Sequence, residues 1–186
     1  MRKMKNEMTT EDIAEVIAEV KSWIELFVIG LDLCPFAKVP FVKDRISYKV
    51  IPLLDHQSFL NNFQQELKLL TENEYATSVI ILPTKSLGFR DYLDLYAQCG
   101  TLLSELEMDD EFQLASFHPD YQFADAAPDD QSNYTNRSPY PLVHILRVDE
   151  VEDAIEAFGD TSSIYKKNIE LLNSLSTQEL KKLTSK

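Results

Sequence analysis

The sequence predicts a compact α/β sandwich built on a four-stranded mixed sheet, with an α+β arrangement as the alternative fold class. Two observations favour this class. Short β-type segments alternate with amphipathic helical segments in the order α-β-α-β-α-β-β-α-α, and a long proline-rich connection, Pro119 to Pro141, joins the last two strands. The 186 residues suffice to close one hydrophobic core, so we expect a single domain over residues 1–186.

The first part of the chain contains three helical patterns and two strand patterns. A capping box formed by Thr9 and Asp12 begins the first helix, and Gly30 follows its last residue. Asp55 is in position to cap the second helix, and Pro83 stops the second strand. The expected elements are a helix over 10–29, a strand over 47–52, a helix that begins after Asp55, a strand over 77–82 and a helix over 89–106.

The second part supplies the remaining two strands and two helices. We expect strands over 112–118 and 142–147, paired antiparallel across the long connection. Helices are expected over 148–158 and 162–175, separated by Gly159. The polar ends of the chain, residues 1–8 and about 177–186, are expected to fray.

Composition and charge restrict the class of partner. A formal charge of −13 opposes binding to nucleic-acid phosphates and to anionic membranes, and no stretch approaches the roughly 18 apolar residues of a membrane span. There is no apolar leader at the N-terminus, and the two cysteines fit a reducing compartment. We therefore expect a cytoplasmic protein whose partner is a small molecule, and the sequence leaves its oligomeric state open.

The connection from Pro119 to Pro141 concentrates side chains that chemistry uses. Its prolines stiffen the backbone, and a loop of this length inside a compact domain is usually functional or disordered. Because aromatic residues and prolines are interleaved along it, we predict a functional loop. The candidate groups in and beside it are His118, Asp120, Tyr121, Asp129, Asp130, Asn136, Arg137, Tyr140 and His144.

Cys34 followed by Pro35 is the clearest chemical motif. A cysteine at an N-cap with proline at N1 places its sulfur near unpaired backbone N–H groups, which stabilise a thiolate and lower the thiol pKa. Lys38, one turn later, would add to this effect. The alternative, a small buried hydrophobe at a helix end, carries equal weight. A glutaredoxin-like site is excluded because Ala37 stands where the second cysteine is required, and Cys99 is expected in the core.

The histidines and Arg137 each have a chemical and a structural interpretation. His118, at a strand end, is a candidate acid/base or metal ligand, or else it bonds the loop backbone. His144, inside a strand, is a candidate ligand or a satisfied core histidine. Arg137 with Asn136 would bind a carboxylate or phosphate; the alternative is an ion pair from Arg137 to an aspartate of the loop, at position 125, 129 or 130.

Three stretches, Leu31–Ala37, Leu114–Phe123 and Thr135–Pro141 with His144–Arg147, resemble a bacterial family catalogued as domain of unknown function 1415. The resemblance extends from the first helix to the start of the last one. It implies a cytoplasmic single-domain protein and names no activity. Ala126 and Ala127 depart from the family pattern, in which a Gly-Thr-type turn precedes the proline. The matching positions are Cys34, Pro35, Phe36, His118, Pro119, Tyr121, Phe123, Pro128, Asp129, Asn136, Arg137, Pro139, Tyr140, Pro141 and His144.

These observations support three hypotheses, and whether the protein is an enzyme stays open. The first is a thiol-dependent enzyme for a small anionic molecule, with Cys34 as nucleophile and His118 as acid/base. Its substrate would be bound by Arg137, Asn136, Tyr121, Lys38 and His144. The second is a zinc or copper site formed by Cys34, His118 and His144 with Asp129 as fourth ligand. The third is a non-catalytic ligand-binding or interaction module.

Overall fold

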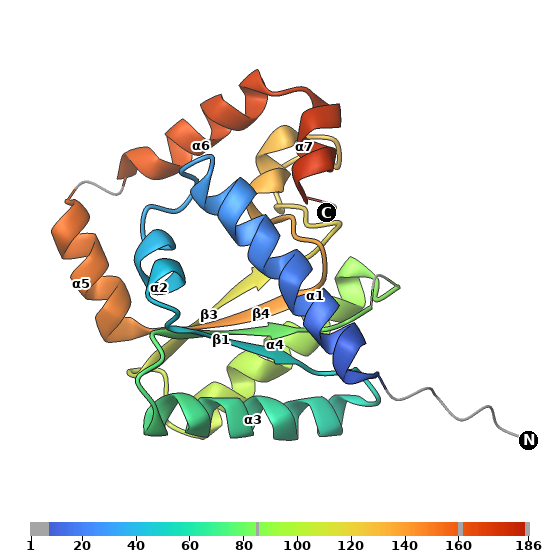
Figure 1. Cartoon of the computed structure of the whole chain (residues 1–186), viewed down its shortest axis with the longest axis vertical. Helices are drawn as coiled ribbons and strands as arrows, with labels where there is room; N and C mark the ends of the chain where they lie inside the picture. The colour runs from blue at the N-terminus through green and yellow to red at the C-terminus, as the bar shows by residue number, and fades with distance from the viewer. Residues whose placement is uncertain (1–7, 85, 160–161, 185–186) are drawn as a thin grey trace, which may run out of the picture.

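The computed structural model describes residues 8–84, 86–159 and 162–184 and contains a four-stranded sheet with helices on both faces (Figure 1). The strands are β1 (Ile46–Val50), β2 (Thr77–Ile81), β3 (Phe112–Phe117) and β4 (Leu142–Arg147). The α-helices are α1 (Thr10–Trp23), α2 (Lys38–Val42), α3 (His56–Glu72), α4 (Phe89–Glu105), α5 (Val148–Phe158), α6 (Ser162–Ser174) and α7 (Thr177–Thr184). A π-helix, η1 (Ile24–Ile29), continues α1, and a 3-10 helix, η2 (Gln131–Asn136), lies in the long connection.

The sheet is mixed, as the sequence predicts. Its strand order is β1-β2-β4-β3, with β1 and β2 parallel and β4 antiparallel to both of its neighbours. The predicted antiparallel pairing of the last two strands is therefore confirmed. Because β2 lies inside the sheet and all five of its residues are buried, it reads as a continuous apolar and β-branched run.

Alternate residues of each strand divide the core into two layers. Ile80 and Leu82 pack on one face of the sheet with residues of α3 and α4, whereas Val79 and Ile81 pack on the other face with α1 and η1. The same alternation separates Leu142 from its neighbour in β4. We call these the α3/α4 face and the α1 face. The position of a residue along its strand decides on which face its side chain lies.

The helix that begins with α1 widens at its end and is followed by a turn. The predicted capping box is present, with Asp12 N–H donating to Thr9 and Thr9 N–H to Asp12. The last turns widen into η1, in which the Gly30 N–H donates to the carbonyl of Glu25, five residues earlier, at 2.9 Å. A Cβ at Gly30 would collide with the carbonyl oxygen of Leu26, so glycine is required there. Asp32 follows in the left-handed region, at φ +54°.

Three short helices were not predicted. Residues 38–42 form α2, residues 131–136 form η2, and residues 177–184, which we expected to fray, form α7. Leu180 of α7 is fully buried, and this burial explains why a lysine-rich segment folds back onto the body. Met8, which we also expected to fray, is partly buried and packs against the core. The predicted fraying of residues 1–7 and 185–186 concerns segments outside the described residues.

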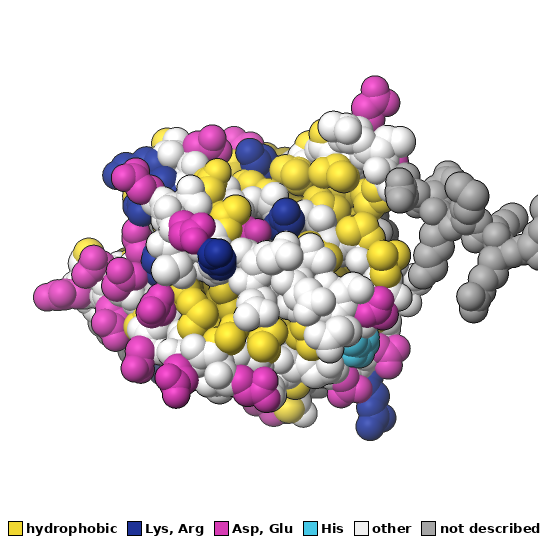
Figure 2. Space-filling model, turned by 90° about the horizontal axis from the view of Figure 1, so that it is seen from below, with side chains coloured by type: hydrophobic (Ala, Val, Ile, Leu, Met, Phe, Trp, Pro, Cys, Tyr) yellow, Lys and Arg dark blue, Asp and Glu magenta, His cyan; other side chains and the backbone are white. Residues whose placement is uncertain are grey.

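The face seen from below in Figure 2 carries acidic side chains around its edge and only separate basic ones, as the charge of −13 leads one to expect. Within the part of the chain that the structure describes, no helix is both long and apolar enough to cross a membrane.

Candidate functional site

A groove of about 690 Å³ lies on the α1 face of the sheet. Its floor consists of side chains from the strands, and α5 forms one wall. The opposite wall is the segment from the end of α1 through η1 to α2, which includes Cys34 and Phe36. The rings of Phe36 and Phe158 meet edge to face, with centroids 5.8 Å apart, and join the two walls. The floor side chains are Ile46, Ala76, Thr77, Val79, Gln113, Ala115, Phe117, Leu142, His144 and Leu146.

His144 supplies the imidazole of the groove floor. Its Nε2 lies 2.6 Å from the hydroxyl oxygen of Thr77, and the Thr77 hydroxyl is 2.5 Å from the carbonyl oxygen of Ile145. A carbonyl only accepts, so the Thr77 proton is used there, and Nε2 of His144 must donate to the hydroxyl oxygen. Burial lowers the pKa of His144 to about 4, so the ring is neutral at pH 7 with its proton on Nε2.

Cys34 lies in the groove wall, with its sulfur near the backbone N–H groups of Phe36 and Ala37. This much agrees with the predicted turn, in which the Ala37 N–H also donates to the Cys34 carbonyl at 3.2 Å. Burial nevertheless raises the pKa of the Cys34 thiol, because the loss of hydration outweighs the two N–H donors, and the Asp32 carboxylate adds to the rise. The predicted low thiol pKa is therefore wrong, and Cys34 carries a protonated thiol at neutral pH.

Lys38 does not assist the thiol. It begins α2 with an exposed side chain and is not among the residues that line the groove. Its predicted contribution to the thiol or to a substrate therefore has no geometric support.

His118 lies on the α3/α4 face, away from the groove. Its ring packs against Tyr92 of α4, with centroids 5.1 Å apart. Nε2 donates to the carbonyl of Leu87 at 2.9 Å, and Nδ1 accepts the backbone N–H of Asp120 at 3.0 Å. Burial lowers the pKa of His118, which fits a neutral ring with one proton. The structure therefore does not pair His118 with Cys34, because both ring nitrogens are occupied by backbone.

Arg137 stabilises the long connection from within. Its Nε donates to the carbonyl of Tyr121 at 3.2 Å and its Nη2 to that of Pro128 at 2.9 Å, and the guanidinium lies 4.5 Å from the centre of the Tyr134 ring. Ion pairs to the loop aspartates are absent among the described residues, so backbone carbonyls replace the carboxylate that we considered. Arg137 is not a lining residue of the groove.

Asn136 and Tyr121 support the same loop. Asn136 donates its side-chain amide to the carbonyl of Ser116 at 3.0 Å, and its own carbonyl accepts the His118 N–H at 3.1 Å. The Tyr121 ring packs 5.1 Å from that of Phe89. Both side chains serve the fold of the loop.

The four residues of the metal hypothesis are not gathered. Cys34 and His144 line the groove, His118 lies on the other face of the sheet, and Asp129 lines a separate hollow against α6. Within residues 8–84, 86–159 and 162–184, no three His, Cys, Asp or Glu side chains are grouped so that they could hold a metal ion. The metal-ligand set predicted from the sequence is therefore wrong.

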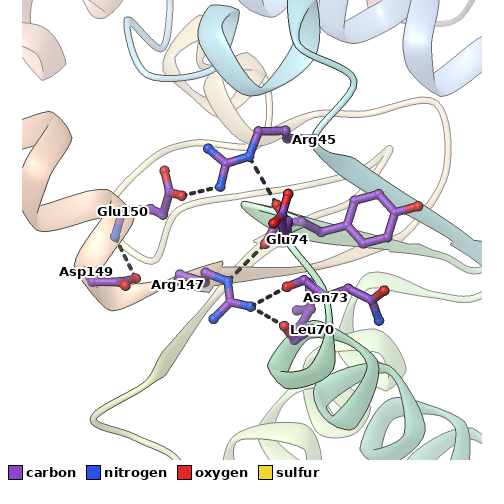
Figure 3. A network of polar contacts seen from close by, with 8 residues as sticks. Arg45, Leu70, Asn73, Glu74, Arg147, Asp149 and Glu150 are labelled. Atoms are coloured by element: carbon purple, nitrogen blue, oxygen red, sulfur yellow. Dashed lines mark hydrogen bonds and ion pairs between the residues drawn. The ribbon is translucent and has the colours of Figure 1, made fainter.

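A network of charged side chains borders the groove where β4 passes into α5 (Figure 3). Arg147 donates to the carbonyls of Leu70, Asn73 and Tyr75, in the last two cases at 3.1 and 2.9 Å. Arg45 forms an ion pair with Glu150 at 2.6 Å. Each of these charges that lines the groove thus has a partner in the protein.

Sequence reasoning missed several residues of the groove, including Thr77, Trp23 and Arg147. Trp23 is the sole tryptophan of the chain, which is the one signal that could have drawn attention to it. Thr77 and Arg147 resemble ordinary strand ends, and only the pairing of β2 with β4 brings Thr77 to His144.

Comparisons with known proteins agree with the resemblance seen in the motifs. No curated protein and no solved structure matches the chain. The family model described as "Protein of unknown function (DUF1415)" matches residues 15–182, and the chain therefore belongs to this family.

Proposed function

We propose that the protein binds a small, largely apolar molecule in the groove between α5 and the sheet. The observation that carries this proposal is the size and lining of the groove. A volume of about 690 Å³ is in the range of small-molecule sites, which are mostly apolar with a few placed polar groups. Cys34, Thr77 and His144 are such groups here.

The walls of the groove favour an apolar body. Phe117 and Trp23 pack edge to face at 5.6 Å on one side, and Phe36 contacts Phe158 on the other. Phe158 keeps 44 % of its surface exposed although it is a large aromatic residue on the inner side of α5. A bound apolar molecule would cover this surface, and removing such area from water is the main source of binding energy in sites of this kind.

Dye binding tests the proposal. N-phenyl-1-naphthylamine is an uncharged dye whose fluorescence rises in apolar sites, and we expect saturable binding to the wild-type protein. Ala115→Phe places a ring in the groove floor and should weaken binding at least tenfold, whereas Ala97→Phe, on the exposed side of α4, should leave it unchanged. Absence of saturable binding, or equal binding by the two variants, would reject the proposal.

A second candidate is thiol chemistry in the same groove, because Cys34 and His144 both line it. In this version the Cys34 sulfur adds to the carbon–carbon double bond of an uncharged Michael acceptor. Nδ1 of His144 takes the thiol proton and returns it to the neighbouring carbon. His144 would then have the role that the sequence gave to His118.

Reaction with N-ethylmaleimide tests this candidate. Mass spectrometry should locate the adduct on Cys34, and His144→Phe should slow its formation about tenfold or more. Equal rates in the wild-type protein and in His144→Phe would reject the role of His144 without affecting the binding proposal.

A further inference from the structure

We infer that the groove selects an uncharged rather than an anionic molecule, whose apolar body carries one hydroxyl or N–H group, and that this group donates a hydrogen bond to Nδ1 of His144. The inference rests on the proposed function, since it names the class of ligand for the same groove. It follows from the tautomer of His144 and from the pairing of the charges around the groove.

The tautomer leaves Nδ1 of His144 as a hydrogen-bond acceptor in the groove floor. Thr77 gives its hydroxyl proton to the carbonyl of Ile145, so His144 must use its proton, on Nε2, to reach Thr77. Nδ1 is then an unprotonated acceptor, and among the described residues no group forms a hydrogen bond to it. A ligand that can donate a hydrogen bond complements this atom.

Nδ1 is also accessible. In the described part of the chain, the fully buried side-chain nitrogen and oxygen atoms without a partner are Nε1 of Trp23 and the hydroxyl of Tyr48. Nδ1 of His144 is unpartnered but is not one of them, so it is not sealed inside the protein. His144 is half-buried and lines the groove, which therefore provides the access.

The charged groups of the groove disfavour an anionic ligand. Arg147 is held by three backbone carbonyls, and Glu150 is paired with Arg45. The ring of His144 is neutral, and no carboxylate contributes to its pKa. Asp153, the remaining charged residue of the lining, is a carboxylate. An anionic ligand would lose its hydration without gaining a free positive charge, and this cost is large in an apolar site. The small anionic substrate of the first hypothesis is thus the wrong class for this groove.

The hydrogen-bond donor is tested with a matched pair of ligands. 2-Naphthol and 2-methoxynaphthalene share one ring system, but only the first has a hydroxyl group. Calorimetry should show that the wild-type protein binds 2-naphthol about tenfold more tightly, as expected for one hydrogen bond to an otherwise unpaired acceptor. His144→Phe keeps an aromatic ring without the acceptor and should bind the two compounds equally.

Two further arms separate the outcomes. 2-Naphthoate carries a charge on the same ring system and should bind at least tenfold more weakly than 2-naphthol. In ¹⁵N NMR of the wild-type protein, which needs no variant to fold, 2-naphthol should shift the signal of the unprotonated His144 nitrogen. Equal affinity of wild-type protein for naphthol and ether would overturn the inference while the binding proposal stands. Failure of both compounds and of the dye to bind would reject the binding proposal itself.

Discussion

The hydroxyl of Thr77 and Nε2 of His144 lie 2.6 Å apart and join the first residue of β2 to the third residue of β4. Thr77 is itself bonded to the carbonyl of Ile145, so the threonine fixes both the orientation and the tautomer of the ring. A half-buried histidine held in this way behaves as a neutral polar group of the groove floor.

The first prediction concerns the charge of His144. Because burial lowers its pKa from the ordinary 6.5 to about 4, NMR titration should show this ring neutral down to about pH 5. Between pH 6.5 and 4 the unfolded chain binds more protons than the folded one, so stability falls as the pH falls through this window. The loss amounts to about 3 kcal/mol by pH 4. Urea unfolding of the wild-type protein and of His144→Phe isolates the contribution of this residue. If their free energies of unfolding differ by the same amount at pH 7 and at pH 4.5, the prediction is contradicted.

The second prediction concerns the Cys34 thiol. Its raised pKa implies that alkylation by iodoacetamide has a midpoint above that of a free thiol, about pH 8.5. Peptide mass spectrometry separates Cys34 from Cys99, whose pKa burial raises to about 12. Cys99 should stay unmodified in the folded protein. A Cys34 midpoint below pH 8 would show that the N–H donors outweigh burial after all.

The third prediction separates structure from function at His118. His118→Ala removes two hydrogen bonds and a buried ring, so the free energy of unfolding should drop by about 2–4 kcal/mol. Dye binding in the groove should be unchanged under conditions where the variant is folded. His56→Ala, at an exposed position, is the matched control and should change stability by less than about 0.5 kcal/mol. Loss of dye binding in the folded His118→Ala variant would show that His118 contributes to the binding site.

Much of the fold followed from periodicity in the sequence. The β-branched run at 77–82, the capping signal at Thr9 and the strand pair around the long connection all correspond to observed elements. Residues 177–184 were missed although Ser176 and Glu179 form a capping box at their start, and Leu180 then packs against the core. The capping signal was present in the sequence, but the burial of Leu180 could not be predicted from this short polar segment.

The site was harder to predict because adjacent residues serve opposite faces. Phe117 lines the groove while His118, the next residue, packs against α4. Nothing in the segment itself says which face will carry a groove. For Cys34, the turn was predictable, but the burial that raises the thiol pKa depends on the tertiary packing around the turn. Asn168 of α6, for example, donates to the carbonyl of the preceding residue, Leu33, at 2.8 Å.

The fourth prediction concerns Arg137. Lysine cannot reproduce two N–H donors in a fixed fork, so Arg137→Lys should lose about 1–2 kcal/mol of stability. Hydrogen exchange should rise in the connection between Tyr121 and Asn136 and stay unchanged in α4. Arg90→Lys, at an exposed position, serves as the control. Equal exchange in Arg137→Lys and the wild-type protein would mean that the prolines alone hold the loop.

The fifth prediction concerns the attachment of α5, which forms a wall of the groove. The ion pair between Arg45 and Glu150 links the start of β1 to the first turn of α5, at 2.6 Å but with more than a third of each side chain exposed. A double-mutant cycle of Arg45→Gln and Glu150→Gln should therefore give a coupling free energy below about 1 kcal/mol in unfolding.

Either single variant frees the start of α5, so affinity for the naphthylamine dye should fall about two- to fivefold while the melting temperature moves little. Lys68→Gln removes a comparable surface ion pair, with Glu72 on α3, and should leave dye affinity unchanged. If the Arg45 and Lys68 variants behave alike, then the packing of Phe158 against Phe36, rather than the ion pair, holds α5 in place.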